Sequence, residues 1–227
     1  MSPSINFVSR SDVAKQFAGK TVAIVGSGPG VLENKPEFID SHDIVMRVNN
    51  YRIMRNTGTR TDVFYSFFGD SIRKTQEELK REGVRLCMCK CPDDYAIASE
   101  WHRRRRQMNG VDFRYIYRNR APFWFCDTYV PTTEDFLEKF SLLGQHIPTT
   151  GFSAILDVLS LEPAAVYLTG FDFFRSGFHN VTDPWSKRQN GDPFAHDPEA
   201  ELRWIAANAD KHPVTFDPAL TQIVQSI

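Results

Sequence analysis

Apolar residues gather in short runs separated by longer polar segments, which is the pattern of an α/β protein. Residues 21–26 (TVAIVG) and 43–48 (DIVMRV) are rich in β-branched side chains, as is typical of strands buried on both faces of a parallel sheet. The same reasoning predicts four further strands, at residues 62–67, 84–89, 113–117 and 165–171.

Helical patterns occupy the intervals between these strands. Helices are predicted at residues 71–82, 93–108, 133–143, 151–161 and 197–209, with a turn and a short helix at 29–40. Residues 1–19 are expected to form only a lead-in. Strands alternating with helices over all 227 residues predict one domain, a Rossmann-like three-layer α/β/α sandwich with a mostly parallel sheet.

Residues 176–195 (SGFHNVTDPWSKRQNGDPFA) interrupt this alternation, because they contain no predicted helix or strand. Long irregular segments inside compact domains are usually functional loops or disordered. His179 inside the segment and His196 directly after it both have aromatic neighbours, so the segment is expected to be a lid over an active site.

Composition excludes several classes of protein. Lys and Arg total 27 against 28 for Asp and Glu, so a net charge of -1 gives no reason to expect a nucleic-acid partner. No apolar stretch approaches the ~20 residues of a membrane span, and no signal peptide is evident, which predicts a soluble cytoplasmic protein. Cys87, Cys89 and Cys91 alternate along one predicted strand and lack the C-x₂-C spacing of zinc sites, so reduced thiols are expected rather than a metal centre.

A glycine loop, Gly26-Ser27-Gly28-Pro29-Gly30, follows the first strand. Glycines let a backbone approach a ligand, and a following helix N-terminus favours a phosphate. A dinucleotide fingerprint would need Gly or Ala where Val31 stands and an acidic residue ending the second strand, and neither is present. The loop therefore predicts a nucleotide site of another kind, with a glycine turn that serves only packing as the alternative.

Further motifs extend this pattern along the chain. Residues 39–49 (IDSHDIVMRVN) and 58–62 (GTRTD), with the glycine loop, resemble the large sialylmotif of glycosyltransferase family 29, the sialyltransferases. Residues 148–152 (PTTGF) and 166–171 (VYLTGF) resemble the small sialylmotif. His179 stands at the third motif, and His196 with Glu201 matches the H-x₄-E of the very short motif. The motifs occur in the family's order.

The resemblance implies the sialyltransferase variant of the GT-A-like fold and a specific chemistry. An inverting transferase of this kind moves a 2-keto sugar acid from its CMP ester to an acceptor hydroxyl, without a cofactor beyond the donor substrate. By the motif match, His196 is the base that deprotonates the acceptor, His179 donates to the leaving phosphate, and Glu201 supports the region. The donor site is expected to contain Gly26, Ser27, Gly28, Asn49, Thr149, Thr150 and Gly151.

Three departures from the family qualify the resemblance. Secretory-pathway members join the large and small motifs by a disulfide, whereas Val22 and residues 161–162 occupy those places here, as a reducing cytoplasm requires. Residues 180–182 replace the aromatics that follow the third-motif histidine. The chain is also shorter than its relatives, so no acceptor-binding residue can be carried over. The absence of D-x-D, a common metal-holding pair, is consistent with metal-independent transfer.

Several alternatives stay open at the level of the sequence. The donor is sialic acid or Kdo, and the acceptor an oligosaccharide or a lipid-linked glycan. Arg103, Arg104, Arg105 and Arg106 form either a solvated helix face or a contact for an anionic acceptor or for a membrane surface. The rival functions are an NADP-dependent oxidoreductase that binds NADPH at Gly26–Gly30 and Arg47, and a nucleotide- or anionic-glycan-binding module without activity.

Overall fold

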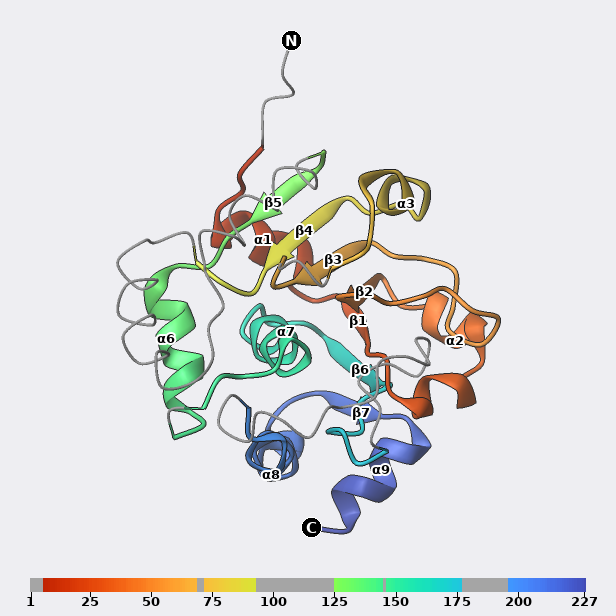
Figure 1. The fold of residues 1–227 in the computed structure, drawn as a ribbon, viewed down its shortest axis with the longest axis vertical. Helices are drawn as coiled ribbons and strands as arrows, with labels where there is room; N and C mark the ends of the chain where they lie inside the picture. The colour runs from red at the N-terminus through yellow and green to blue at the C-terminus, as the bar shows by residue number, and fades with distance from the viewer. Residues whose placement is uncertain (1–5, 69–71, 93–124, 145, 177–195) are drawn as a thin grey trace.

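A single sheet of seven strands forms the centre of the protein in a computed structural model (Figure 1). The structure describes residues 6–68, 72–92, 125–144, 146–176 and 196–227. Its strands lie in the order β5-β4-β3-β2-β1-β6-β7, and all neighbours pair in parallel. The strands are β1 (Thr21–Val25), β2 (Ile44–Val48), β3 (Val63–Ser66), β4 (Leu86–Cys89), β5 (Asp127–Tyr129), β6 (Ala165–Thr169) and β7 (Val214–Phe216).

Helices cover both faces of this sheet, so the predicted three-layer α/β/α class is confirmed. In Figure 1, α2 and α3 lie on one side of the strands, whereas α6, α7 and α8 lie on the other. The helices are α1 (Arg10–Phe17), η1 (Pro29–Glu33), α2 (Pro36–Asp40), α3 (Gln76–Arg81), α6 (Thr133–Ser141), α7 (Thr150–Leu159), α8 (Pro198–Asn208), η3 (Ala209–Lys211) and α9 (Pro218–Gln225).

Alternating side chains of the strands supply hydrophobic clusters on the two faces of the sheet. Val22 and Ile24 of β1 join the large cluster that contains residues of α1 and α7, whereas Ala23 and Val25 face the cluster formed with η1 and α2. Both pairs are at most 1% exposed. A strand buried on both faces reads as one continuous apolar run, which is why the sequence identified β1 so clearly.

The strand order places a topological switch point between β1 and β6. From β1 the chain adds β2, β3, β4 and β5 in one direction, and it then returns to place β6 and β7 on the opposite side. Open α/β sheets bind ligands at such a reversal, outside the carboxyl ends of the strands. The loop after β1 and the loop after β6 therefore meet where a ligand is expected.

The expectation of a plain lead-in over residues 1–19 is wrong. Helix α1 occupies Arg10–Phe17, and Ser9 and Asp12 form a capping box at its start. Val13 and Phe17 are fully buried against the sheet. The S-x-x-D signal was present in the sequence, but only two of the eight helical residues are buried, so its periodicity is weak.

Short elements at the edges of the sheet also escaped the sequence analysis. Strands β5 and β7 have three residues each, too few to show an alternating pattern, and α9 follows β7 directly. Helix α3 begins only after its N-cap Thr75, so it is shorter than predicted. The strand predicted at 113–117, the helix at 93–108 and nearly all of the 176–195 segment lie outside the described residues.

Candidate active site

The glycine loop packs directly on the loop that follows β6. The amide of Gly26 donates to Thr169 O (2.8 Å), and the amide of Gly28 donates to Gly170 O (2.7 Å). A Cβ on Gly26 would lie 2.3 Å from Gly170 O, and Gly170 itself has a φ of 72°. Close approach of the two loops therefore requires glycine at both positions, so the packing role considered for this loop is real.

Arg47, the arginine of the large motif, is a structural residue. It is fully buried at the end of β2, and its guanidinium donates to Thr57 O (2.6 Å), Arg60 O (3.0 Å) and Thr61 Oγ1 (3.1 Å). These bonds fold the segment after β2 back onto the sheet. A guanidinium used in this way does not present itself to a cofactor phosphate, which removes the basis for NADPH recognition by Arg47.

Asp40 plays a related part for the GTRTD segment. Its carboxylate accepts hydrogen bonds from the amide and hydroxyl of Thr59, at 2.8 and 2.9 Å, and from the amide of Arg60 at 3.1 Å. Burial by itself would raise the pKa of Asp40, but these hydrogen bonds outweigh it and lower the pKa. In the large motif, Asp40 and the glycines thus stabilise loop conformations rather than bind a ligand.

Asn49 directly follows β2 in a left-handed conformation, with a φ of 50°. Its backbone amide donates to Tyr65 O (3.0 Å), and its side-chain Oδ1 accepts from Ser66 Oγ (3.1 Å). Phe173 and Phe174, in the loop after β6, also have positive φ. Backbone strain of this kind is held by surrounding structure and gathers at functional sites.

The small motif begins helix α7 beside the glycine loop. Thr149 is the N-cap, and its Oγ1 accepts from the amide of Phe152 (3.1 Å). Thr150 and Gly151 are the first helical residues, whose N–H groups have no acceptor within the helix. The ring of Phe171 joins the two motifs, because a Cβ on Gly151 would lie 2.7 Å from its Cε1 and one on Gly26 would lie 3.3 Å from its Cε2.

Glu201 of α8 forms hydrogen bonds with Thr149, the N-cap of α7. Its two carboxylate oxygens accept from the amide of Thr149 (2.6 Å) and from the Thr149 hydroxyl (2.8 Å). The residue is 1% exposed. Burial raises the pKa of Glu201 to about 7, although the bonds from Thr149 and the charge of Lys90 act in the opposite direction. These hydrogen bonds therefore connect the very short motif to the N-terminus of α7.

His196 lies just before α8, which Asp197 caps through the amide of Ala200 (2.9 Å). Its Nδ1 lies 2.6 Å from Ile147 O. A carbonyl oxygen only accepts, so Nδ1 must carry the proton and Nε2 is the acceptor nitrogen of the neutral ring. The ring is half-buried. This tautomer is the one that a general base needs.

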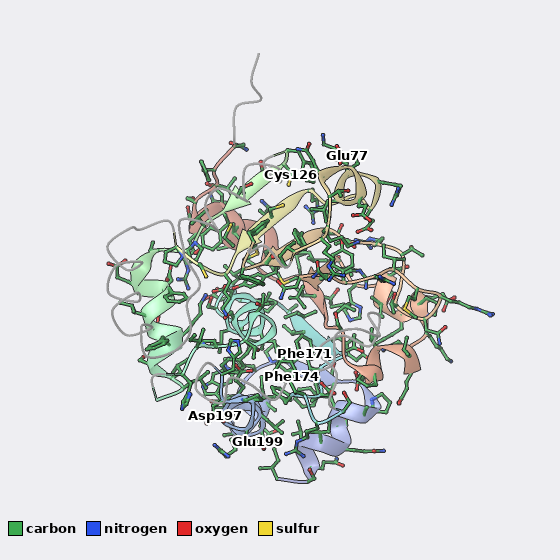
Figure 2. All side chains as sticks on the ribbon, in the orientation of Figure 1. Glu77, Cys126, Phe171, Phe174, Asp197 and Glu199 are labelled. Carbon is green, nitrogen blue, oxygen red and sulfur yellow. The ribbon has the colours of Figure 1, made fainter. Side chains whose placement is uncertain are left out.

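The loop after β6 is fastened to the start of α8. Arg175 forms an ion pair with Glu199 (3.0 Å), and Asp172 accepts from the amides of Phe174 and Ser176, both at 3.1 Å. Figure 2 labels Phe171 and Phe174 of this loop and Asp197 and Glu199 of the α8 start in the same part of the molecule. The sequence analysis placed residues 165–171 in a strand and 166–171 in the small motif, whereas β6 ends at Thr169, and it named no site residue between 172 and 176.

The nominated donor-site residues divide by exposure. Gly26 and Gly28 are buried and shape the loop, whereas a second group is half-buried. This second group consists of Ser27, Asn49, Thr149, Thr150 and Gly151. His179 and Arg103–Arg106 lie outside the described residues, so their assigned roles stay predictions.

Fold and site together define an α/β protein in which the loops after β1 and β6 meet at the switch point of the sheet, and in which His196 contacts Ile147 in the segment that leads into α7. Residues 6–205 match the family model for glycosyltransferase family 29 (sialyltransferase). The chain therefore belongs to this family of glycosyltransferases, which confirms the resemblance drawn from the motifs and decides against an oxidoreductase. No individually curated protein sequence matches the chain.

Solved sialyltransferase structures share this fold. The sialyltransferase CstII from Campylobacter jejuni in complex with CMP-3FNeuAc has a TM-score of 0.58 and 16% identity, over 87% of this chain and 81% of that one. A mammalian sialyltransferase in complex with Gal-beta-1-3GalNAc-ortho-nitrophenol has a TM-score of 0.51 and 17% identity, over 89% of this chain and 71% of that one. Across the described residues, no helix is long and apolar enough to span a bilayer.

Proposed function

We propose that the protein is an inverting, metal-independent transferase that moves a 2-keto sugar acid from its CMP ester to a glycan hydroxyl. The observation that carries this proposal is the hydrogen bond from His196 Nδ1 to Ile147 O, because it fixes the proton on Nδ1 and makes Nε2 the basic nitrogen of the ring. CstII binds CMP-3FNeuAc and, in another structure, a trisaccharide acceptor and CMP. These ligands are the classes of donor and acceptor that we propose for this chain.

The reaction is a single displacement at the anomeric carbon. The acceptor hydroxyl gives its proton to His196 Nε2, and its oxygen forms a bond to that carbon. The bond from the carbon to the phosphate oxygen breaks, and its electron pair leaves with CMP. Attack opposite the leaving group inverts the configuration. The Ile147 carbonyl stabilises the imidazolium that forms, because Nδ1–H donates to it in both protonation states.

Neutral donors at the start of α7 suit the leaving phosphate. The first-turn amides of Thr150 and Gly151 and the positive end of the helix dipole stabilise negative charge that develops on CMP. Ser27 and Asn49, on the neighbouring loops, are proposed to contact the nucleotide, and His179 to donate to the phosphate. CMP carries one phosphate, so a metal that bridges a diphosphate is not needed, in keeping with the lack of D-x-D.

Titration calorimetry tests the proposal first. The purified protein is titrated with CMP in EDTA and, separately, with NADPH, and product is then followed from CMP-sialic acid and from CMP-Kdo. Binding of CMP in EDTA and transfer from one of the two donors are expected. Binding that requires a divalent ion would refute metal independence, and no CMP binding would refute the donor assignment. The anomeric configuration of the product, read by NMR, tests inversion.

Location and the arginine run belong to the same proposal. We propose a cytoplasmic enzyme that contacts an anionic lipid surface or a lipid-linked acceptor through Arg103–Arg106. Replacing the four arginines with glutamine should raise the acceptor Michaelis constant without changing donor hydrolysis, and should release the protein from anionic vesicles. Unchanged acceptor kinetics and unchanged sedimentation with vesicles would make these residues ordinary solvated surface.

A further inference from the structure

Asp217, outside the residues matched by the family model, lies beneath the glycine loop. It is 1% exposed and caps α9 by accepting from the amide of Leu220 (2.7 Å) through Oδ1. Its other oxygen, Oδ2, accepts from the Thr169 hydroxyl (2.8 Å) and from the Gly170 amide (2.9 Å). One carboxylate therefore joins the C-terminal helix to the loop that packs on Gly26 and Gly28.

The hydrogen-bonded network continues from Thr169 into the glycine loop. Asn34 donates to Thr169 Oγ1 (2.6 Å), to Gly30 O (3.2 Å) and to Val31 O (3.0 Å), and its Oδ1 accepts from Tyr167 OH (2.5 Å). A Cβ on Gly30 would lie 2.9 Å from Asp217 Oδ2. One buried set of hydrogen-bonded polar groups thus fixes the loops after β1 and β6, which meet at the switch point.

We propose that Asp217 is a positioning residue for the donor site, which holds the Thr169–Gly170 turn and, through Asn34, the glycine loop in the conformation that binds the nucleotide. This inference rests on the proposed function. Attraction cannot be its role, because a carboxylate near a phosphate repels it. Geometry is the remaining contribution: both oxygens must accept at once, which a carboxylate does and an amide cannot.

Asp217→Asn is the decisive variant for that reason. Asn is also a good N-cap, so it can keep the bond from Leu220, but its NH₂ then faces the Gly170 amide and the Thr169 hydroxyl. Asp210→Asn is the matched control, since it makes the same change at an exposed site in the same segment. Thr169→Val removes the hydroxyl with little change of shape and leaves the cap of α9 untouched.

Calorimetric titration with CMP gives the first measurement. Asp217→Asn and Thr169→Val should each raise the dissociation constant for CMP about tenfold or more, whereas Asp210→Asn should leave it within about twofold. If Asp217 affected CMP only through the repulsion between its carboxylate and the phosphate, Asp217→Asn would bind CMP as tightly as the parent protein or more tightly. This result would overturn the inference. If Asp217→Asn fails to fold, Thr169→Val decides by the same criterion.

Kinetics separate positioning from general damage. The Michaelis constant for the donor should rise, while kcat at saturating donor and the acceptor Michaelis constant change little. Amide hydrogen exchange of the peptides that contain Gly26–Gly30 and Gly170 should quicken without faster exchange in β3. Equal loss of kcat in every assay would refute a positioning role. Failure of the parent protein to bind CMP would instead refute the proposed function, whereas normal binding by both variants would refute only the role of Asp217.

Discussion

Glutamine at position 201 should make the stability of the protein less dependent on pH. Burial raises the pKa of Glu201 to about 7 from an ordinary value of 4.5. The folded protein therefore holds this proton at pH values where the unfolded chain has released it. With the folded pKa above the unfolded one, stability falls as pH rises from about 4.5 to about 7.

The size of this effect follows from the same two values. At about 1.36 kcal/mol for each pKa unit, ionising Glu201 in the folded state costs about 3 kcal/mol once the pH is above 7. Glutamine resembles the protonated acid, since its oxygen still accepts from the Thr149 amide. Replacing the neutral acid by an amide changes its hydrogen bonding with Thr149, which should cost about 1 kcal/mol independently of pH.

Urea denaturation at pH 5, 6, 7 and 8 measures the difference. Glu201→Gln should be no more stable than the parent protein at pH 5 and should gain on it by about 2 to 3 kcal/mol by pH 8. The control is Glu199→Gln, an exposed position on the first turn of the same helix, whose stability should follow the parent protein in parallel. Parallel curves for Glu201→Gln as well would refute a raised pKa at this residue.

Three further results are expected. His196→Ala should lower kcat by about 10² to 10⁴ while CMP affinity stays within about twofold, since the role proposed for the ring is to deprotonate the acceptor. Arg47→Met should lower the free energy of unfolding by about 3 kcal/mol in urea, because it leaves buried carbonyls without donors. Diamide should link Cys87 to Cys126, whose sulfurs lie 3.5 Å apart, and closing a loop of about 39 residues should stabilise the protein by about 4 kcal/mol.

Each result has a control and an outcome that contradicts it. His212→Ala should keep full transfer, and unchanged turnover in His196→Ala would remove the base assignment. Arg55→Met, at an exposed site, should cost less than about 0.5 kcal/mol, and an equal cost at position 47 would contradict the scaffold role. Thiol titration should fall from four groups to two after diamide, and four reactive thiols, or a bridge through Cys89, would contradict the pairing.

The predictability of the fold depended on how each element is buried. The six-residue runs around β1 and β2 are buried on both faces, so composition alone identified them. Strand β7 has half-buried residues around an exposed Thr215, which leaves neither a continuous nor an alternating pattern. Helix α9 has one fully buried residue, Leu220. Only the tertiary structure shows that β7 and α9 support the glycine loop.

The site was partly predictable because the residues of each motif lie near one another in the sequence. The hydrogen bonds that connect different motifs join residues that are far apart in the sequence. Thr149 and Glu201 were both named as site residues, but their direct hydrogen bonds span 52 positions of the chain and no spacing rule predicts them. The same holds for the contact of His196 with Ile147. Residue types reveal which groups carry chemistry, and the fold decides which of them meet.

The motifs divide into those whose residues hold the loops at the switch point and the one that contains the proposed base. In the large motif, Asp40 and Arg47 bind backbone groups of the segment 57–60, and Gly26 accommodates Gly170. A match to this motif is therefore strong support for the fold and weak support for any particular ligand. The very short motif differs, because His196 is half-buried and its tautomer is fixed by a carbonyl. The assignment of transfer chemistry consequently depends on His196 more than on the longer motif, and its alanine variant is the sharper test of function.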